Sequence, residues 1–300
     1  MSAFMIAVMN DTTTFEQYRS LLFSIAYRML GGVAEAEDMV QETFLRWQRH
    51  PGEEIQSDKA WLTTIITRLC IDHLKSARVR REQYVGVWLP EPLVEADDDD
   101  PAKAAELADS LTNAFLLIVE TLSPIERAVF LLREVFDYDY SEISQIVGKS
   151  DANCRQMTVR ARERLAARRP RFDADPVRAG KLLNRFLQVR ERGDSEGLLD
   201  LLTEDAAIYS DGGGKVAAVR YPILGATKVA RFFINIQRIV ERRQVEVQAR
   251  FAVINAEPGL LVFRDGKLEQ TMTFELSDGL IQAVYIVRNP DKLKHLTKLN

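Results

Sequence analysis

The hydrophobic period changes along the chain, and this change constrains the fold more than any other feature. From Thr14 to Arg169, apolar residues recur mainly at the three- to four-residue spacing of helices. After one more predicted helix, over residues 176–192, the stretch Val245 to Phe251 alternates with a period of two. Asp265-Gly266 and Asp278-Gly279 then separate apolar runs, which is a strong hairpin signal. We therefore predict a helical part followed by an α+β tail with an antiparallel sheet.

Length and composition set the frame for this division. A chain of 300 residues has room for two or three domains. We expect one helical domain over residues 10–83, a linker over 84–106, a second helical domain over 107–171 and the tail over 174–300. The prolines of Trp88-Leu89-Pro90-Glu91-Pro92 exclude a continuous helix in the linker.

Charge and cysteine content narrow the class of protein. The formal net charge is −4, so any binding of nucleic acid must use a local basic patch. Cys70 and Cys154 show no spacing typical of metal ligands or of a disulfide framework. No signal peptide and no apolar run of membrane-spanning length is visible, so we expect a cytoplasmic protein without a membrane partner. No cofactor or metal is predicted.

Three helices are predicted in the first part. Thr14 and Gln17 resemble a capping box that begins the first helix, and Gly31-Gly32 ends it. The second helix is expected from Ala34 to Arg49, and the third from about Asp58.

Residues 140–165 predict a helix-turn-helix. Ile143, Ile146 and Val147 mark the inner side of a short helix, Gly148-Lys149 forms a turn, and Ser150 or Asp151 can cap the next helix. In such a motif the second helix enters the major groove, where Arg and Gln bind guanine and adenine. Its side chains predicted to read DNA are Asn153, Arg155, Gln156 and Arg160. A basic run that could bind phosphates extends through Arg162, Arg164, Arg168, Arg169 and Arg171.

Several segments resemble the extracytoplasmic-function sigma factors of the sigma-70 family. The run from Asp38 to Arg46, DMVQETFLR, is similar to their region that binds core RNA polymerase. Leu122-Ser123-Pro124-Ile125-Glu126-Arg127 and the following Leu131-Leu132-Arg133 resemble the start of sigma region four. The resemblance implies two partners, core RNA polymerase and promoter DNA. The residues predicted to dock on polymerase share one helix face: Asp38, Gln41, Glu42 and Leu45.

Trp61-Leu62, Ile65-Ile66, Asp72 and Leu74 resemble the sigma helix that melts and reads the minus-ten element. An aromatic group and several cations suit that task, because an unstacked base needs a platform and the strand needs counter-charge. The candidate residues are Trp61, Arg68, His73, Lys75, Arg78, Arg80 and Arg81. Many family members carry Asn where this chain has Arg68, and core packing of Trp61 stays open as an alternative.

Three further motifs resemble signatures of one sigma subgroup, in which a C-terminal SnoaL-like domain of the nuclear-transport-factor-two type is fused to the sigma regions. The motifs are Trp88-Leu89-Pro90, Asp211-Gly212-Gly213-Gly214-Lys215 and Asn289-Pro290-Asp291-Lys292-Leu293. The fold class implied is two all-α sigma domains followed by an α+β cone with a curved antiparallel sheet. The motifs are expected to form an intramolecular regulatory contact, with Lys215 pairing to an acidic group of the helical half.

The leading hypothesis is an alternative sigma factor that directs promoter-specific transcription and is modulated by its tail; it is not an enzyme. Two alternatives stay open. One is a helix-turn-helix regulator that works without polymerase, and the other is a SnoaL-like domain with its own enzymatic activity or small-molecule ligand. Asp205, Tyr209 and Asp211 are the residues that such a pocket would use.

Overall fold

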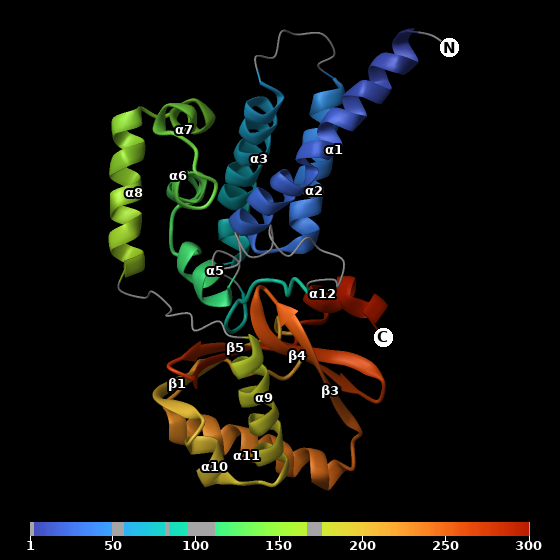
Figure 1. Ribbon diagram of the computed structural model, residues 1–300, viewed down its shortest axis with the longest axis vertical. Coiled ribbons are helices and arrows are strands. Elements are labelled where there is room, and N and C mark those ends of the chain that lie inside the picture. The colour runs from blue at the N-terminus through green and yellow to red at the C-terminus, as the bar shows by residue number, and fades with distance from the viewer. Residues whose placement is uncertain (1–2, 50–56, 82–83, 95–111, 167–175, 300) are drawn as a thin grey trace. The chain divides into compact units, whose positions relative to one another are not determined.

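The computed structural model describes residues 3–49, 57–81, 84–94, 112–166 and 176–299 (Figure 1). Of these, residues 3–11, 77–81, 166, 176, 177 and 297–299 are described by their backbone alone. The chain forms two compact units. The helical unit contains the described residues up to 81 and those of 118–166. The tail unit contains residues 84–94 and 112–117 together with 176–299.

The helical unit packs its helices around buried apolar faces. Its elements are α1 (Ala3–Leu30), α2 (Val33–Gln48), α3 (Asp58–Arg81), α6 (Pro124–Glu134), α7 (Tyr140–Val147) and α8 (Asp151–Ala166). Phe15, Leu22, Ile25 and Met29 of α1 are buried at the spacing that the sequence predicted. Gly31, with φ of 72°, ends α1 as expected.

The predicted start of α1 is wrong. Thr14 lies inside the helix and does not cap it, because α1 already begins at Ala3. Residues 3–13 contain neither proline nor glycine and are mostly apolar, so nothing in them interrupts the helix.

The tail unit is an α+β domain, which confirms the predicted fold class. Its elements are α5 (Asn113–Val119, whose last two residues belong to the helical unit), α9 (Pro176–Glu191), α10 (Ser195–Leu199), β1 (Leu202–Asp211), β2 (Ile223–Leu224), α11 (Ala226–Arg243), β3 (Val247–Ile254), β4 (Glu257–Arg264), β5 (Lys267–Ser277), β6 (Leu280–Val287), α12 (Pro290–Leu293) and a 3₁₀ turn (Lys294–Leu299). Both Asp-Gly pairs form the predicted hairpin turns, between β4 and β5 and between β5 and β6.

The sheet differs from the prediction in one respect. Its strand order is β2-β1-β6-β5-β4-β3, and β1 runs parallel to β6 while the other pairs are antiparallel. Hairpin signals report only strands that are neighbours in sequence, so this long-range pairing was not visible. Register shifts interrupt three of the ladders, and such bulges bend a sheet.

Residues of the predicted linker cover one face of this sheet. Alternate residues of β6 enter two different apolar clusters: Val284 packs with α9, α10 and α11, and Tyr285 packs with Leu89 and Ala114. Since successive side chains of a strand point to opposite faces, the helices cover one face and the linker covers the other. The linker is therefore a structural part of the tail unit.

Candidate functional site

The predicted polymerase-binding face lies on the solvent side of α2. Asp38, Gln41 and Leu45 are exposed, whereas Ala36, Val40, Thr43 and Trp47 form the buried side of the helix. Glu42 is half-buried and accepts a 2.8 Å hydrogen bond from Arg46 one turn later. The four predicted residues thus share an accessible surface, as the helical spacing required.

The candidate minus-ten residues of α3 have mixed surroundings. Trp61 is half-buried, with its ring 5.4 Å from that of Trp47, so it packs inside the helical unit. His73 is half-buried, and Lys75 is exposed beside Asp72. Arg78, Arg80 and Arg81 belong to the last turn of α3, and their side chains lie outside the described residues.

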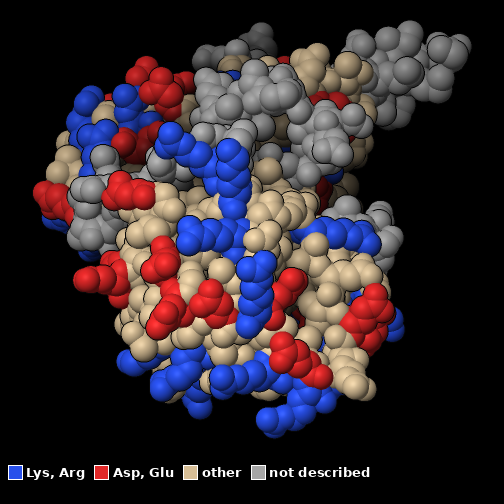
Figure 2. All heavy atoms as spheres, turned by 60° about the horizontal axis from the view of Figure 1, so that its bottom comes forward, with Lys and Arg blue, Asp and Glu red and all other residues tan. Residues whose placement is uncertain are grey.

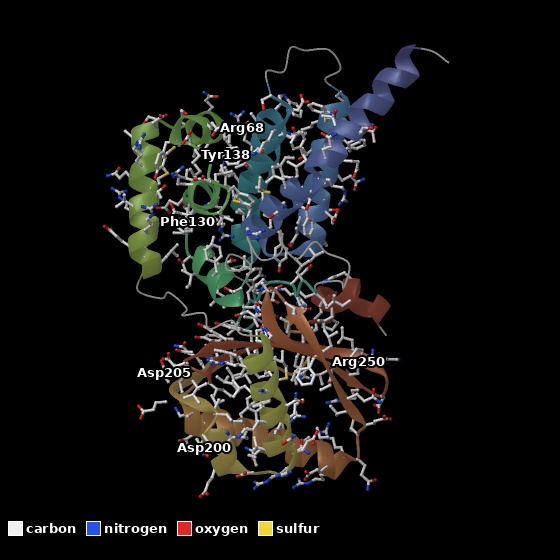
Figure 3. All side chains as sticks on the ribbon, in the orientation of Figure 1. Arg68, Phe130, Tyr138, Asp200, Asp205 and Arg250 are labelled. Atoms are coloured by element: carbon white, nitrogen blue, oxygen red, sulfur yellow. The ribbon has the colours of Figure 1, made fainter. Side chains whose placement is uncertain are left out.

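Arg68 makes a contact that the sequence did not predict. Its Nε donates to the carbonyl of Ile146 at 2.8 Å, and its Nη2 donates to that of Gln145 at 2.9 Å. These carbonyls end α7, where the helix dipole favours a cation. Five residues earlier on α3, the hydroxyls of Thr63 and Tyr138 are 2.9 Å apart; Figure 3 labels Arg68 and Tyr138. The α3 helix is therefore held against the helix-turn-helix within this unit.

The helix-turn-helix has the predicted construction. Asp139 and Glu142 form a capping box on α7, Gly148 ends that helix with φ of 67°, and the Ser150 hydroxyl accepts from the Asn153 amide of α8. The predicted DNA-reading side chains are all exposed on α8: Asn153, Arg155, Gln156 and Arg160. The Arg155 guanidinium also lies 4.5 Å from the ring centre of Tyr140.

Part of the predicted phosphate-binding run is already paired within the protein. Arg162 makes two hydrogen bonds to Glu134, and Arg164 contacts Glu126 at 3.4 Å. Both carboxylates belong to α6, so a sequence count of charges along α8 overstated its free positive charge. Arg168, Arg169 and Arg171 lie outside the described residues.

The three subgroup motifs meet at a buried ion pair, which we call the linker site. Lys292 Nζ lies 2.9 Å from Asp211 Oδ2, and the two side chains are 8% and 0% exposed. Asp211 ends β1, while Lys292 lies in α12, which Asn289 caps by accepting from the Asp291 amide. Burial strengthens this interaction, but it also makes each charge costly without its partner.

Residues of the linker complete the linker site. The Leu89 amide donates to Asp211 Oδ2 at 2.9 Å, and the Tyr84 hydroxyl donates to Asp211 Oδ1 at 2.5 Å. Lys292 also donates to the Leu89 carbonyl and lies 4.3 Å from the ring centre of Trp88. Burial, followed by the Asp211 carboxylate, raises the pKa of Tyr84, which stays a protonated donor. A linker peptide is thus bound by backbone, aromatic and apolar contacts together.

The glycine loop fits this arrangement closely. Gly213 has φ of +61°, and its backbone amide donates to Asp211 Oδ1. A Cβ at this position would stand 2.3 Å from the side-chain nitrogen Nδ2 of Asn289, so only glycine fits here. Lys215 pairs with Asp291, whose pKa falls to about 2 because Lys215 and Lys294 hold its charged form. The partner expected for Lys215 in the helical half is therefore not the one observed.

The linker is also anchored to the tail at residues after Trp88. Leu89 is fully buried and Pro90 is buried beside it. The Leu93 amide donates to Asn255 Oδ1 at 2.7 Å, and the backbone amide of Asn255 donates to the Leu93 carbonyl at 2.8 Å. His295, which the sequence placed in an unassigned terminal tail, lies 2.8 Å from the Pro92 carbonyl. No motif signalled Asn255 or His295, because their roles depend on where the linker lies on the sheet.

A second buried polar cluster holds Asn113, the first residue of α5, within the tail unit. The backbone amide and Nδ2 of Asn113 both donate to Glu257 Oε2 at 2.9 Å, and Nδ2 also donates to Thr273. Glu257 Oε1 is buried and has no hydrogen-bond partner among the described residues. Burial raises the pKa of Glu257 to about 8, and the neighbouring Glu275 acts in the same direction. This carboxyl is therefore neutral at ordinary pH.

The three residues proposed to line a small-molecule pocket do not share one environment. Asp205 is exposed (Figure 3), Tyr209 stacks on Tyr285, and Asp211 is enclosed by the linker. In the described parts of the chain, no group of three His, Cys, Asp or Glu side chains is arranged to hold a metal ion. Nor does any helix described there combine the length and apolarity of a membrane span.

Comparison with known proteins agrees with this arrangement. The profile of Sigma-70 region 2 matches residues 14–80, and that of Sigma-70 region 4 matches residues 112–165. The ECF RNA polymerase sigma factor SigJ of Mycobacterium tuberculosis is 34% identical over 294 residues, covering 94% of this chain and 93% of SigJ. Probable sigma factor SigI of the same species is 29% identical, covering 95% of each chain. The crystal structure of SigJ aligns with a TM-score of 0.75 at 30% identity, over 94% of this chain and 98% of that one.

The two sigma regions and the fused tail define a promoter-directing transcription factor of the sigma-70 type. The chain belongs to the extracytoplasmic-function RNA polymerase sigma factors, as its similarity over nearly the whole length shows. Its partners are therefore core RNA polymerase and promoter DNA.

Proposed function

We propose that the tail modulates this sigma factor by clamping the linker between its two DNA-binding regions. The observation that carries the proposal is the linker site, where the buried Asp211–Lys292 pair holds Tyr84, Trp88 and Leu89. Residues 83–117 join the two parts of the helical unit. A free chain of about 35 residues would let those two parts separate by up to roughly 120 Å when fully extended. The clamp removes most of that freedom.

The two anchored residues Tyr84 and Asn113 each lie only a few positions in sequence from a sigma region. Residues 82 and 83 alone separate the end of α3 from Tyr84, and α5 continues from the anchored Asn113 directly into the helical unit. The distance by which regions 2 and 4 can separate then depends on the tail, not on the length of the linker.

Promoter binding requires that spread. The minus-ten and minus-thirty-five elements lie ~25 base pairs apart, which is ~85 Å of duplex at 3.4 Å per pair. Packed helices lie only about 8–10 Å apart, and here α3 packs directly on α6 and α7. The helical unit must open for α3 and α8 to reach both elements at once, and Arg68 must leave the end of α7. Release of the linker favours that open form.

We assign the remaining predicted roles on the same basis. The exposed face of Asp38, Gln41, Glu42 and Leu45 docks on core polymerase, and Arg155, Gln156 and Arg160 read the minus-thirty-five element. In this proposal the tail is a regulatory domain without catalysis, and the protein works in the cytoplasm, where polymerase acts. A small-molecule ligand that displaces the linker is the alternative regulator.

Run-off transcription with purified core polymerase tests the clamp. Leu89→Ser places a hydroxyl in the apolar cluster of the linker site and leaves residues 174–300 unchanged. We expect more transcript than from the wild-type chain, because the clamp is weakened. Val85→Ser, at a 57% exposed linker position, is the matched control and should behave as wild type. Equal transcript from Leu89→Ser and Val85→Ser would show that the linker site does not restrain the sigma regions.

A further inference from the structure

The surface of the tail carries a basic stripe that neither the family assignment nor the clamp explains. The stripe follows α11 at spacings of three, four, three and four residues, which place its members on one face. Its members are Lys228, Arg231, Asn235, Arg238 and Arg242. All are exposed, and the fourteen helical steps from Lys228 to Arg242 give the stripe a length of ~21 Å. Figure 2 shows Lys and Arg side chains gathered along the lower edge of the view.

In the part of the chain that the structure describes, no carboxylate pairs with the cations of the stripe. For Lys228, Arg231, Arg238 and Arg242, none of the described carboxylates lies within 4.0 Å. The acidic residue of α11, Glu241, accepts instead from Gln237. This differs from α8, where Arg162 and Arg164 are paired with glutamates.

Such a stripe is unfavourable for the isolated domain. Lys228 and Arg231 are like charges three residues apart, and Arg238 and Arg242 are like charges four residues apart. Each such pair destabilises a helix by about 0.2–0.5 kcal/mol. A polyanionic partner reverses the sign of this effect, because its phosphates separate and neutralise the cations.

A second helix of the tail also carries a basic row. On α9, which packs against α11, the residues Arg178, Lys181 and Arg185 are exposed at the same helical spacing. The chain as a whole carries a net charge of −4, so this concentration of cations on two helices of the tail is local.

We propose that the α11 stripe binds the phosphate backbone of promoter duplex upstream of the minus-thirty-five element. The tether selects this partner: residues 167–175 join α8 to α9, so the start of α9 lies within ~35 Å of the end of the DNA-reading helix. With α8 in the major groove, flanking duplex is present near the tail at an effective concentration of the order of mM. The downstream side leads towards region 2 and polymerase, which leaves the upstream duplex for the stripe.

Binding of the full-length chain to two DNA lengths tests the inference. One duplex ends at the minus-thirty-five element, and the other extends 20 base pairs further upstream. The variant Arg231→Ala/Arg238→Ala removes two cations, and Ala favours the helix. Arg192→Ala/Lys267→Ala removes the same charge from exposed positions off the stripe.

We expect wild type and the control to bind the long duplex more tightly than the short one. The stripe variant should lose this advantage, and on the long duplex its slope of log affinity against log salt should be smaller by about 2. That change corresponds to a roughly tenfold smaller loss of affinity between 50 and 200 mM salt. Equal binding of both duplexes by wild type, or a stripe variant that matches the control, would overturn the inference.

Two further experiments separate this inference from the role assigned to α8 and from membrane binding. Arg155→Ala should weaken binding to both duplexes, since α8 is present on each; if it does not, the assigned role of α8 fails and not that of the stripe. Vesicles containing anionic phosphatidylserine test the membrane alternative for a basic helix that also exposes Ile236 and Ile239. Vesicle binding that depends on Arg231 and Arg238, with duplex binding unchanged, would assign the stripe to a lipid surface instead.

Discussion

At the scale of single residues, the Asp211–Lys292 pair is the interaction on which the linker site depends. Breaking a buried pair by removing one partner leaves an uncompensated charge and costs about 3–5 kcal/mol. Lys292→Met should therefore destabilise the tail unit by this amount in urea unfolding followed by tyrosine and tryptophan fluorescence. Asp211→Asn added to Lys292→Met should cost much less than the sum of the two single changes.

An exposed pair in the same motifs serves as the comparison. Lys215→Met removes the partner of Asp291 at the surface, where an ion pair contributes about 0–1 kcal/mol. If Lys292→Met is as mild as Lys215→Met, the linker site is not held by its buried charges.

Glu257 predicts a dependence of stability on pH. Its pKa is about 8 in the folded protein and 4.5 without burial, so between these values the folded state holds a proton that the unfolded state has lost. Stability therefore falls as pH rises through this window, by up to about 1.4 kcal/mol per pH unit from this group. Glu257→Gln should flatten the pH profile of unfolding and leave the chain more stable than wild type at pH 8.

The exposed Glu204→Gln is the control for this measurement and should leave the profile unchanged. Parallel pH profiles for wild type and Glu257→Gln would contradict a neutral Glu257 carboxyl in the folded protein.

At the scale of secondary-structure elements, α2 is expected to carry polymerase binding. Reversing charge at Asp38 and Glu42 together should abolish co-purification with core polymerase, because both face the outer side of the helix. The fold should survive, since surface changes usually alter stability by about 0.5 kcal/mol or less. Glu191→Lys/Glu196→Lys on the tail is the matched control. Retained co-purification of the Asp38/Glu42 variant would remove this role from α2.

The same scale shows what could be predicted from sequence. The helix-turn-helix and both hairpins depend on local signals, such as the apolar side of Ile143 and Ile146 and the Asp-Gly turns, so they were predicted correctly. The start of α1 and the parallel β1–β6 pairing were not. A capping motif inside a helix-forming run is ambiguous, and strands whose paired residues lie 76–79 positions apart leave no local pattern.

The site residues also divide into those that a sequence motif signalled and those that it did not. The motifs around Trp88, Asp211 and Lys292 were recognised as one contact, but their chemistry was hidden until the fold brought three distant segments together. Asn113 and Glu257 had no sequence signal at all, since neither lies in a motif and their contact spans 144 residues. The ion pairs of Arg162 and Arg164 show the converse error, in which a basic run is counted as free charge.

At the scale of the whole molecule, the proposed clamp keeps sigma regions 2 and 4 together until the linker leaves the tail. A distance between spin labels on α3 and α8 reports this directly. Asp72 and Glu163 are exposed positions for the two introduced cysteines. The natural Cys70 and Cys154 are buried, and burial raises the pKa of both thiols, so they react slowly with the label.

The free wild-type chain should give a short and narrow distribution of label distances, because α3 and the helix-turn-helix pack in one unit. Leu89→Ser should shift that distribution to longer and broader distances, and Val85→Ser should leave it unchanged. A distribution for Leu89→Ser that coincides with that of the wild-type chain would contradict the clamp.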